Sequence, residues 1–361
     1  MLSGLIAEYA SWKWVFGVCA IMAGAVSVAG ILFVPPPPPS TILANTESRG
    51  SKLPPVDWIG GTLITIGMIA LMFALTEGNV VGWATPWIPV LIVVSVIIIA
   101  IFVAWQMYLE RHPEGRPPLM KVSVFRNRRF SAVMIIMGLF AASFNNFIIF
   151  ATFYYQDFQG YSPLQTMLRF IPTGIGGALI ALVVSQLLGR VPTTFIVLTG
   201  SVAVAISNLL FAAPIPPTTS YFAFGMPAMI LAVLGADTTF PCVTLFTSSA
   251  LPPQDQAVGA ALINAVSQFG RAIGLAISTA TQTAVMAHQR GVNVKNVGPV
   301  KQWDGPSLQG IHAASWVAFG FGVGSAIIIL VAFRSMEIVG KVKPRPPRQT
   351  TEGGILSGKQ V

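Results

Sequence analysis

The chain has 361 residues, of which 54% are hydrophobic and only 9% are charged. Because a soluble domain carries about one-quarter charged residues, this composition excludes an ordinary soluble protein and indicates a polytopic membrane protein. The net charge of +9 would suit a nucleic-acid partner. The basic residues, however, fall between apolar runs and form no single amphipathic face, so we expect no nucleic-acid binding.

Nine apolar runs are long enough to cross a bilayer, for which about 18 or more residues are needed. They predict an all-α membrane protein, and a shorter apolar stump over residues 2–10 precedes the first of them. In chain order the runs cover residues 13–34, 58–75, 86–109, 130–153, 164–188, 194–212, 220–249, 258–286 and 313–333.

The distribution of lysine and arginine predicts the orientation of these spans. One set of alternate loops, together with the tail after Phe333, holds most of the basic residues, whereas the other set holds Lys13, Arg290, Lys295 and Lys301. Since cytoplasmic loops carry the excess of positive charge, we expect the tail and the long loops to be cytoplasmic and in contact with lipid headgroups.

The stretch before the second span begins with an unbroken run of prolines, Pro35–Pro39. Five prolines cannot continue a helix and favour a stiff polyproline segment, so residues 35–56 are predicted to be a linker. A basic loop over residues 110–129 separates the hairpin of spans two and three from the six spans that follow.

The seventh and eighth spans each carry an ionisable residue in the middle, Asp237 and Arg271. A charge deep in lipid costs roughly 3 kcal/mol or more, so both side chains are expected to face protein or water. The depths of the two residues differ by about one helical turn, which makes an ion pair feasible. Asn264, Gln268 and Arg271 follow helical spacing and predict a polar stripe on the eighth span.

Two interpretations of this pair stay open. In one, Asp237 and Arg271 form a structural ion pair, and Asn264 and Gln268 make interhelical hydrogen bonds. In the other, Asp237 takes up and releases a proton during transport, with a pKa set by burial and by the nearby arginine.

Further polar residues lie among apolar ones in other spans. Asn145 and Asn146 are surrounded by phenylalanines, as in a cavity for flat amphipathic molecules, although an asparagine pair can also bond a neighbouring helix. Arg169 lies one or two turns below the predicted outer surface, where it either reaches the headgroups or contacts substrate.

No residue constellation suggests an enzyme. The histidines His112, His288 and His312 fall in predicted loops without acids or cysteines at ligand spacing, and no Gly-rich phosphate loop occurs. We therefore expect no catalytic residues, no metal and no cofactor.

Several short motifs occur in a fixed order along the chain. They are Ser11–Phe16, Tyr154–Gln156, Tyr161–Thr166, Leu168–Pro172, Gly235–Asp237 with Phe240–Pro241, and Gln268–Gly274. In this order and spacing they resemble the 14-helix drug:proton antiporters of the major facilitator superfamily, and are closest to the fungal aminotriazole-resistance type. The resemblance covers nearly the whole chain and implies a major facilitator fold.

The resemblance also implies an N-terminally truncated, incomplete fold, because the stump and nine spans would correspond to the end of helix 5 and to helices 6–14. Alternating access needs two halves around a central site, and we expect one whole half here. The expected parts are a remnant of the N-terminal bundle, a Pro-rich cytoplasmic linker, a linking hairpin, a basic cytoplasmic loop, a C-terminal six-helix bundle and a basic cytoplasmic tail, over residues 1–34, 35–56, 57–109, 110–129, 130–334 and 335–361.

The expected function is proton-coupled export of small organic compounds or drugs, in the plasma or vacuolar membrane, with inactivity of the fragment as a possibility. The alternative is a non-transporting membrane sensor or partner-binding remnant. The residues assigned to proton coupling or to the ion pair are Asp237 and Arg271. Those assigned to the substrate cavity are Asn145, Asn146, Asn264, Gln268, Tyr154 and Arg169.

Overall fold

The structure is a computed structural model that describes residue 6 and residues 11–33, 57–112, 118–188, 190–251 and 255–333. The predicted Pro-rich linker and basic tail, and all but one residue of the stump, lie outside these residues. In the described ranges the regular elements are all helical, and nine helices are long and apolar enough to cross a membrane. The nine predicted spans are thereby confirmed.

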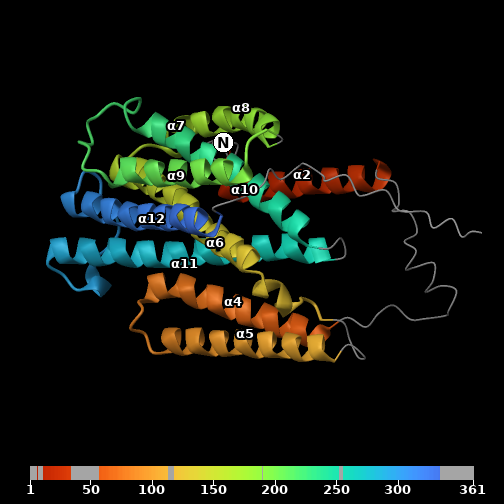
Figure 1. Cartoon of the computed structure of the whole chain (residues 1–361). Helices are drawn as coiled ribbons and strands as arrows, with labels where there is room; N and C mark the ends of the chain where they lie inside the picture. The colour runs from red at the N-terminus through yellow and green to blue at the C-terminus, as the bar shows by residue number, and fades with distance from the viewer. Residues whose placement is uncertain are drawn as a thin grey trace, which may run out of the picture.

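Figure 1 shows how the helices of the described part are arranged. In chain order they are α2 (Trp12–Phe33), α4 (Trp58–Val81), α5 (Trp87–Arg111), η1 (Val122–Arg126), α6 (Arg128–Phe153), η2 (Tyr154–Phe158), α7 (Pro163–Arg169), α8 (Ile171–Leu187), α9 (Thr193–Ala212), α10 (Gly225–Ala250), α11 (Gln256–Arg290), η4 (Val294–Asn296) and α12 (Gly305–Ala332).

Several helices extend beyond the predicted spans, because backbone hydrogen bonding continues after the hydropathy falls. Helix α4 continues past the predicted end at Leu75 through residues 76–81, which include Glu77 and Asn79, and ends before Gly82, whose φ of 91° suits glycine without strain. Helix α12 starts at Gly305 with a proline in its first turn. The prediction that His288 and His312 lie in loops was therefore wrong, since they belong to α11 and α12.

Helices α6 to α12 form one bundle, in which α6, α9 and α12 lie innermost. Helix α9 packs against α10 and α12, whereas α6 packs against α11 and α12. Helix α8 covers α10 at the edge, and only 6% of the apolar window of the α7–α8 span is buried. This arrangement leaves α8, α10 and α11 with large surfaces that the described residues do not cover.

Close approach inside the bundle depends on glycines where two helices cross. A methyl group built on Gly270 of α11 would collide with the backbone of Gly138 on α6. A methyl group on Gly235 of α10 would stand 2.7 Å from the carbonyl oxygen of Gly200 on α9. Small residues at such crossings let helix backbones touch in a membrane, where dispersion contacts supply much of the association energy.

Helices α4 and α5 form a hairpin beside α11 (Figure 1), and a buried acid fixes its end. The Asp57 carboxylate accepts hydrogen bonds from Gly60 N at 2.9 Å, Trp105 Nε1 at 3.1 Å and Gln106 Nε2 at 2.7 Å. Gln106 Oε1 in turn accepts from Met120 N at 3.3 Å. The hairpin is thus tied to the basic segment that leads into α6.

An ion pair connects that basic segment to the break between α10 and α11. Lys121 Nζ lies 2.8 Å from Asp255 Oδ2. Helix α2 stands apart from these contacts, and none of its apolar window is buried by the described residues. Bundle and hairpin therefore have defined anchors to each other, and α2 adds little to either.

Candidate functional site

Asp237 lies in the middle of α10 and faces α8. A methyl group built on Gly177 of α8 would stand 3.0 Å from Asp237 Oδ2, so the carboxylate lies over a position that has no side chain. Asp237 is half-buried and forms no ion pair or hydrogen bond with another described residue. It is an intramembrane acid without a protein partner in the described ranges.

Arg271 lies in α11 and is also half-buried. Its Nε atom is fully buried and has no hydrogen-bond partner among the described residues. The ion pair with Asp237, one of the two alternatives drawn from the sequence, is not formed, because the described ion pairs within 4.0 Å are Lys121–Asp255 and Arg290–Asp304.

The reason is the packing order of the helices. Helix α10 packs chiefly against α8 and α9, whereas α11 packs chiefly against α6 and α12. An ion pair between Asp237 and Arg271 would require α10 and α11 to be close neighbours, and here they contact each other only weakly. The similar depths of Asp237 and Arg271 therefore do not bring the two side chains together.

The predicted polar stripe on α11 faces away from the neighbouring helices in its first half. Asn264 and Gln268 are exposed, and Asn264 Nδ2 donates only to the carbonyl oxygen of Ala260, one turn back, at 3.1 Å. The interhelical hydrogen bonds considered for these two residues are not formed in the described part of the chain. Both side chains remain available to water, to a ligand or to another part of a carrier.

The stripe continues into the second half of α11 through two residues that the sequence analysis missed. Ser278 follows Arg271 by seven positions and Gln282 follows Ser278 by four, so both lie on the same side of the helix. Ser278 Oγ and Gln282 Nε2 are buried and have no hydrogen-bond partner within the described ranges. The sequence signal was present, because the helical spacing of Asn264, Gln268 and Arg271 continues through Leu275 to Ser278 and Gln282.

Asn146 adds an amide from α6 next to this stripe. Its side chain is fully buried, and neither Nδ2 nor Oδ1 finds a hydrogen-bond partner among the described residues. Nδ2 would lie 3.2 Å from a methyl group built on Gly274 of α11, so the amide occupies the α6–α11 contact. Asn145, its neighbour, is half-buried. We group Asn146, Ser278 and Gln282 with Arg271 as the unpaired polar row.

The structure does not bring Tyr154 and Arg169 to this row. Tyr154 is 4% exposed and packs in an aromatic cluster with Phe158, Phe211 and Phe224. Arg169 lies where α7 meets α8, with its guanidinium 3.7 Å from the centre of the Tyr161 ring. Both residues belong to the end of the bundle where η2 follows α6.

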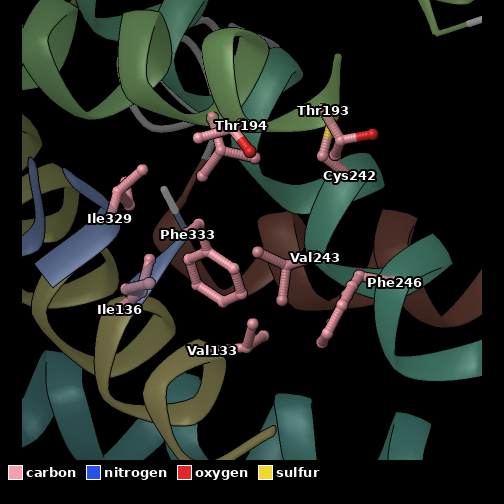
Figure 2. Close-up of a pocket in the computed structure, with 10 residues that line it drawn as sticks. Val133, Ile136, Thr193, Thr194, Cys242, Val243, Phe246, Ile329 and Phe333 are labelled. Carbon is pink, nitrogen blue, oxygen red and sulfur yellow. The ribbon is translucent and has the colours of Figure 1, made fainter. Parts of the chain in front are cut away.

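Figure 2 shows a cavity near the opposite end of the bundle, between α6, α9, α10 and α12. The side chains of Val133, Ile136 and Val243 surround Phe333 there, and Cys242 lies on the α10 side. The cavity has a volume of about 20 Å³, which holds a single water-sized sphere. It is a packing gap and offers no room for an organic substrate.

Comparison with known proteins shows which family the chain resembles. A family model described as Major Facilitator Superfamily matches residues 1–275. The Low affinity ammonium transporter of Saccharomyces cerevisiae is 28% identical, over 79% of this chain and 53% of its own length. The Aminotriazole resistance protein of the same yeast is 26% identical, over 79% and 50%. The Efflux pump terJ of Aspergillus terreus is 24% identical, over 95% and 61%.

The chain spans about half to three-fifths of the length of these relatives. The resemblance drawn from the short motifs is confirmed, since an aminotriazole resistance protein and an efflux pump are among the similar proteins. A family model that matches most of the chain agrees with the apolar helices of the described part. The chain is a multi-pass membrane protein that belongs to the Major Facilitator Superfamily.

Proposed function

We propose that the chain supplies the substrate-binding and proton-coupling residues of an exporter of small organic compounds. The observation that carries this proposal is the unpaired polar row, Asn146, Arg271, Ser278 and Gln282, within helices that are otherwise apolar. Buried polar groups in proteins are nearly always hydrogen-bonded, so a row of unpaired ones supports a role with water or a ligand.

The row suits an amphipathic organic molecule. Asn146 offers a donor and an acceptor, Ser278 and Gln282 add further polar atoms, and the surrounding helices present apolar and aromatic surface. The relatives are named for ammonium transport, aminotriazole resistance and efflux, which supports transport of small solutes and leaves the individual substrate to experiment.

Asp237 is the proposed proton carrier. An acid tied to a fixed ion pair keeps its charge, whereas an acid without a partner can bind and release a proton as its surroundings change. The absence of a described partner for Asp237 therefore favours proton coupling over the structural ion pair. In this proposal the C-terminal tail is cytoplasmic, and the membrane is the plasma or vacuolar membrane.

Flux measurements in proteoliposomes test the proposal. Vesicles holding the protein are given a pH gradient, and uptake of an uncharged fluorescent organic compound is followed. We expect Asp237→Asn to abolish gradient-driven flux while substrate binding, measured without a gradient, is retained. Glu77→Gln, a half-buried acid of α4, is the matched control and should leave flux unchanged.

Two results would count against the proposal. Unchanged gradient-driven flux in Asp237→Asn would remove the proton role from this residue. Binding of substrate that is insensitive to Asn146→Leu and Gln282→Leu would remove the unpaired polar row from the substrate site. Absence of both binding and flux in the unaltered protein would favour the sensor or partner-binding alternative.

A further inference from the structure

Arg169 lies beneath a cage of three tyrosines at the end of the bundle opposite η1. Its guanidinium carbon lies 3.7 Å from the ring centre of Tyr161, 5.6 Å from that of Tyr155 and 6.0 Å from that of Tyr221. One nitrogen donates to the carbonyl oxygen of Gln165 at 3.0 Å. No acid pairs with this guanidinium in the described part of the chain, so a fixed positive charge is held without a counter-charge.

This charge borders a cavity of about 280 Å³. The walls come from Gln159 and Tyr161 after η2, from residues 217–221 between α9 and α10, and from Trp303 before α12. Tyr155 also lines it, and its hydroxyl group is buried without a hydrogen-bond partner among the described residues, on a side chain that is 2% exposed. The cavity thus combines a cation, an unused buried donor and aromatic walls.

The walls of the cavity are held in place by contacts outside it. Trp303 has a φ of 53°, an unusual value for a residue other than glycine, and its backbone N–H donates to the carbonyl oxygen of Phe158 at 3.1 Å. The next residue, Asp304, pairs with Arg290 Nη2 at 2.5 Å and accepts from Ser307 Oγ at 2.7 Å. Preorganised walls reduce the cost of ordering a site around a ligand.

A second set of hydrogen bonds holds the loop between α9 and α10. Gln159 Nε2 donates to the carbonyl oxygen of Pro217 and to Tyr154 Oη, both at 3.3 Å. Tyr221 Oη donates to the carbonyl oxygen of Arg169 at 2.6 Å, which fixes the backbone that carries the cation. The tyrosine cage therefore does not depend on Arg169 alone for its shape.

We propose that this cavity binds an oxyanion attached to an apolar group, such as an aromatic carboxylate. The free N–H edges of Arg169 would donate to the carboxylate as a charge-assisted pair, and the Tyr155 hydroxyl would add a further donor. The rings of Tyr161, Phe224 and Trp303 would contact the apolar part. A cationic ligand is disfavoured by the unpaired guanidinium.

The proposal does not depend on transport, because binding is measured on the protein at rest. A lipid headgroup phosphate offers the same oxyanion chemistry as a free carboxylate, so the experiment distinguishes the two sources. The full chain is placed in phosphatidylcholine nanodiscs, and 4-fluorobenzoate is titrated while its ¹⁹F resonance is followed. 4-Fluorobenzylammonium, which carries the same ¹⁹F label, serves as the cationic counterpart of similar size.

We expect saturable binding of 4-fluorobenzoate that falls roughly tenfold in Arg169→Gln and several-fold in Tyr155→Phe. Lys295→Gln removes a positive charge from the exposed element η4 after α11 and should leave affinity unchanged. Tyr155→Phe removes one oxygen atom only, so it keeps the test valid if Arg169→Gln fails to fold. Mass spectrometry of retained phospholipid covers the second source, since loss of bound lipid in Arg169→Gln would assign the site to a headgroup.

Two outcomes would overturn the proposal. One is equal affinity for 4-fluorobenzoate in the unaltered protein and both variants, with no change in retained lipid. The other is binding of 4-fluorobenzylammonium as tight as that of 4-fluorobenzoate.

Discussion

Two buried or half-buried acids in this molecule, Asp57 and Asp237, have opposite surroundings. Asp57 accepts hydrogen bonds from Gly60, Trp105 and Gln106 at one end of the α4–α5 hairpin. Asp237 has no ion-pair or hydrogen-bond partner among the described residues of the bundle. The difference shows that a buried acid stabilises the fold when hydrogen-bond donors satisfy its carboxylate, as in a saturated acid such as Asp57. An unsaturated acid such as Asp237, whose carboxylate has no such donors, costs stability, which favours a role other than a structural one.

The largest expected effect is on the saturated acid. Asp57→Ala leaves three donors, from Gly60, Trp105 and Gln106, without their acceptor, and we expect a loss of about 3 kcal/mol in stability. Thermal unfolding in detergent measures the loss, and hydrogen exchange should localise it to α4, α5 and the segment around Met120. An unfolding temperature equal to that of the unaltered protein would contradict the view of Asp57 as an anchor.

Asn146→Leu should change stability in the opposite direction. The substitution replaces a buried amide that has no described partner by an apolar group of similar volume, so we expect a gain of about 1 kcal/mol. Thermal unfolding provides the measurement, with Asn208→Leu as the control. Asn208 Nδ2 donates to Ser143 and Val204, and its replacement should destabilise the bundle. Destabilisation by both variants would show that Asn146 is bonded in the native protein.

The contacts of Asp304 with Arg290 and Ser307, just before α12, give a smaller, pH-dependent effect on stability. Hydrogen bonds from Arg290 and Ser307 hold the pKa of Asp304 below its ordinary value. A lowered folded-state pKa contributes stability that is present above the unfolded pKa, near 4, and is lost as the pH falls through the folded pKa. Protection of residues 291–304 from hydrogen exchange should therefore decline on acidification below about pH 4. In Asp304→Asn, protection should already be reduced at neutral pH, by an amount worth at most about 1 kcal/mol.

The smallest expected effect on stability belongs to the unsaturated acid. Asp237→Asn removes a charge that has no described partner. The free energy of unfolding at pH 7 should therefore stay unchanged or rise, by no more than about 0.5 kcal/mol. Chemical unfolding in mixed micelles compares the variant with Asp57→Ala. If the two variants lose similar stability, the contrast between the two acids is wrong.

The sequence predicted the helices well because hydropathy reports each span separately. The nine spans are confirmed, and Asp237 and Arg271 were correctly located within α10 and α11. The partners of these helices were not predictable from one sequence. Helix α11 packs against α6 because the two surfaces fit, with Gly270 and Gly138 in backbone contact. Such complementarity is a property of two segments that are far apart in the sequence.

The polar contacts at the ends of the helices were missed for a related reason. Asp57 and Gln106 are separated by almost fifty positions, and each one alone resembles an ordinary residue at a span boundary. Arg290 was counted only as a marker of orientation, although it bonds Asp304, Ser307 and the carbonyl oxygen of Val297. Ser278 and Gln282, in contrast, could have been found by continuing the helical spacing of the α11 stripe beyond Arg271.

The two described ion pairs lie at the two ends of the bundle, Lys121–Asp255 at one and Arg290–Asp304 at the other. Surface charges are screened within about 8 Å at physiological ionic strength and more strongly in concentrated salt. The middle of the bundle depends on apolar contacts and glycine crossings, which electrolyte does not weaken. Concentrated sodium chloride should therefore loosen both rims of the protein while its lipid-embedded centre stays intact.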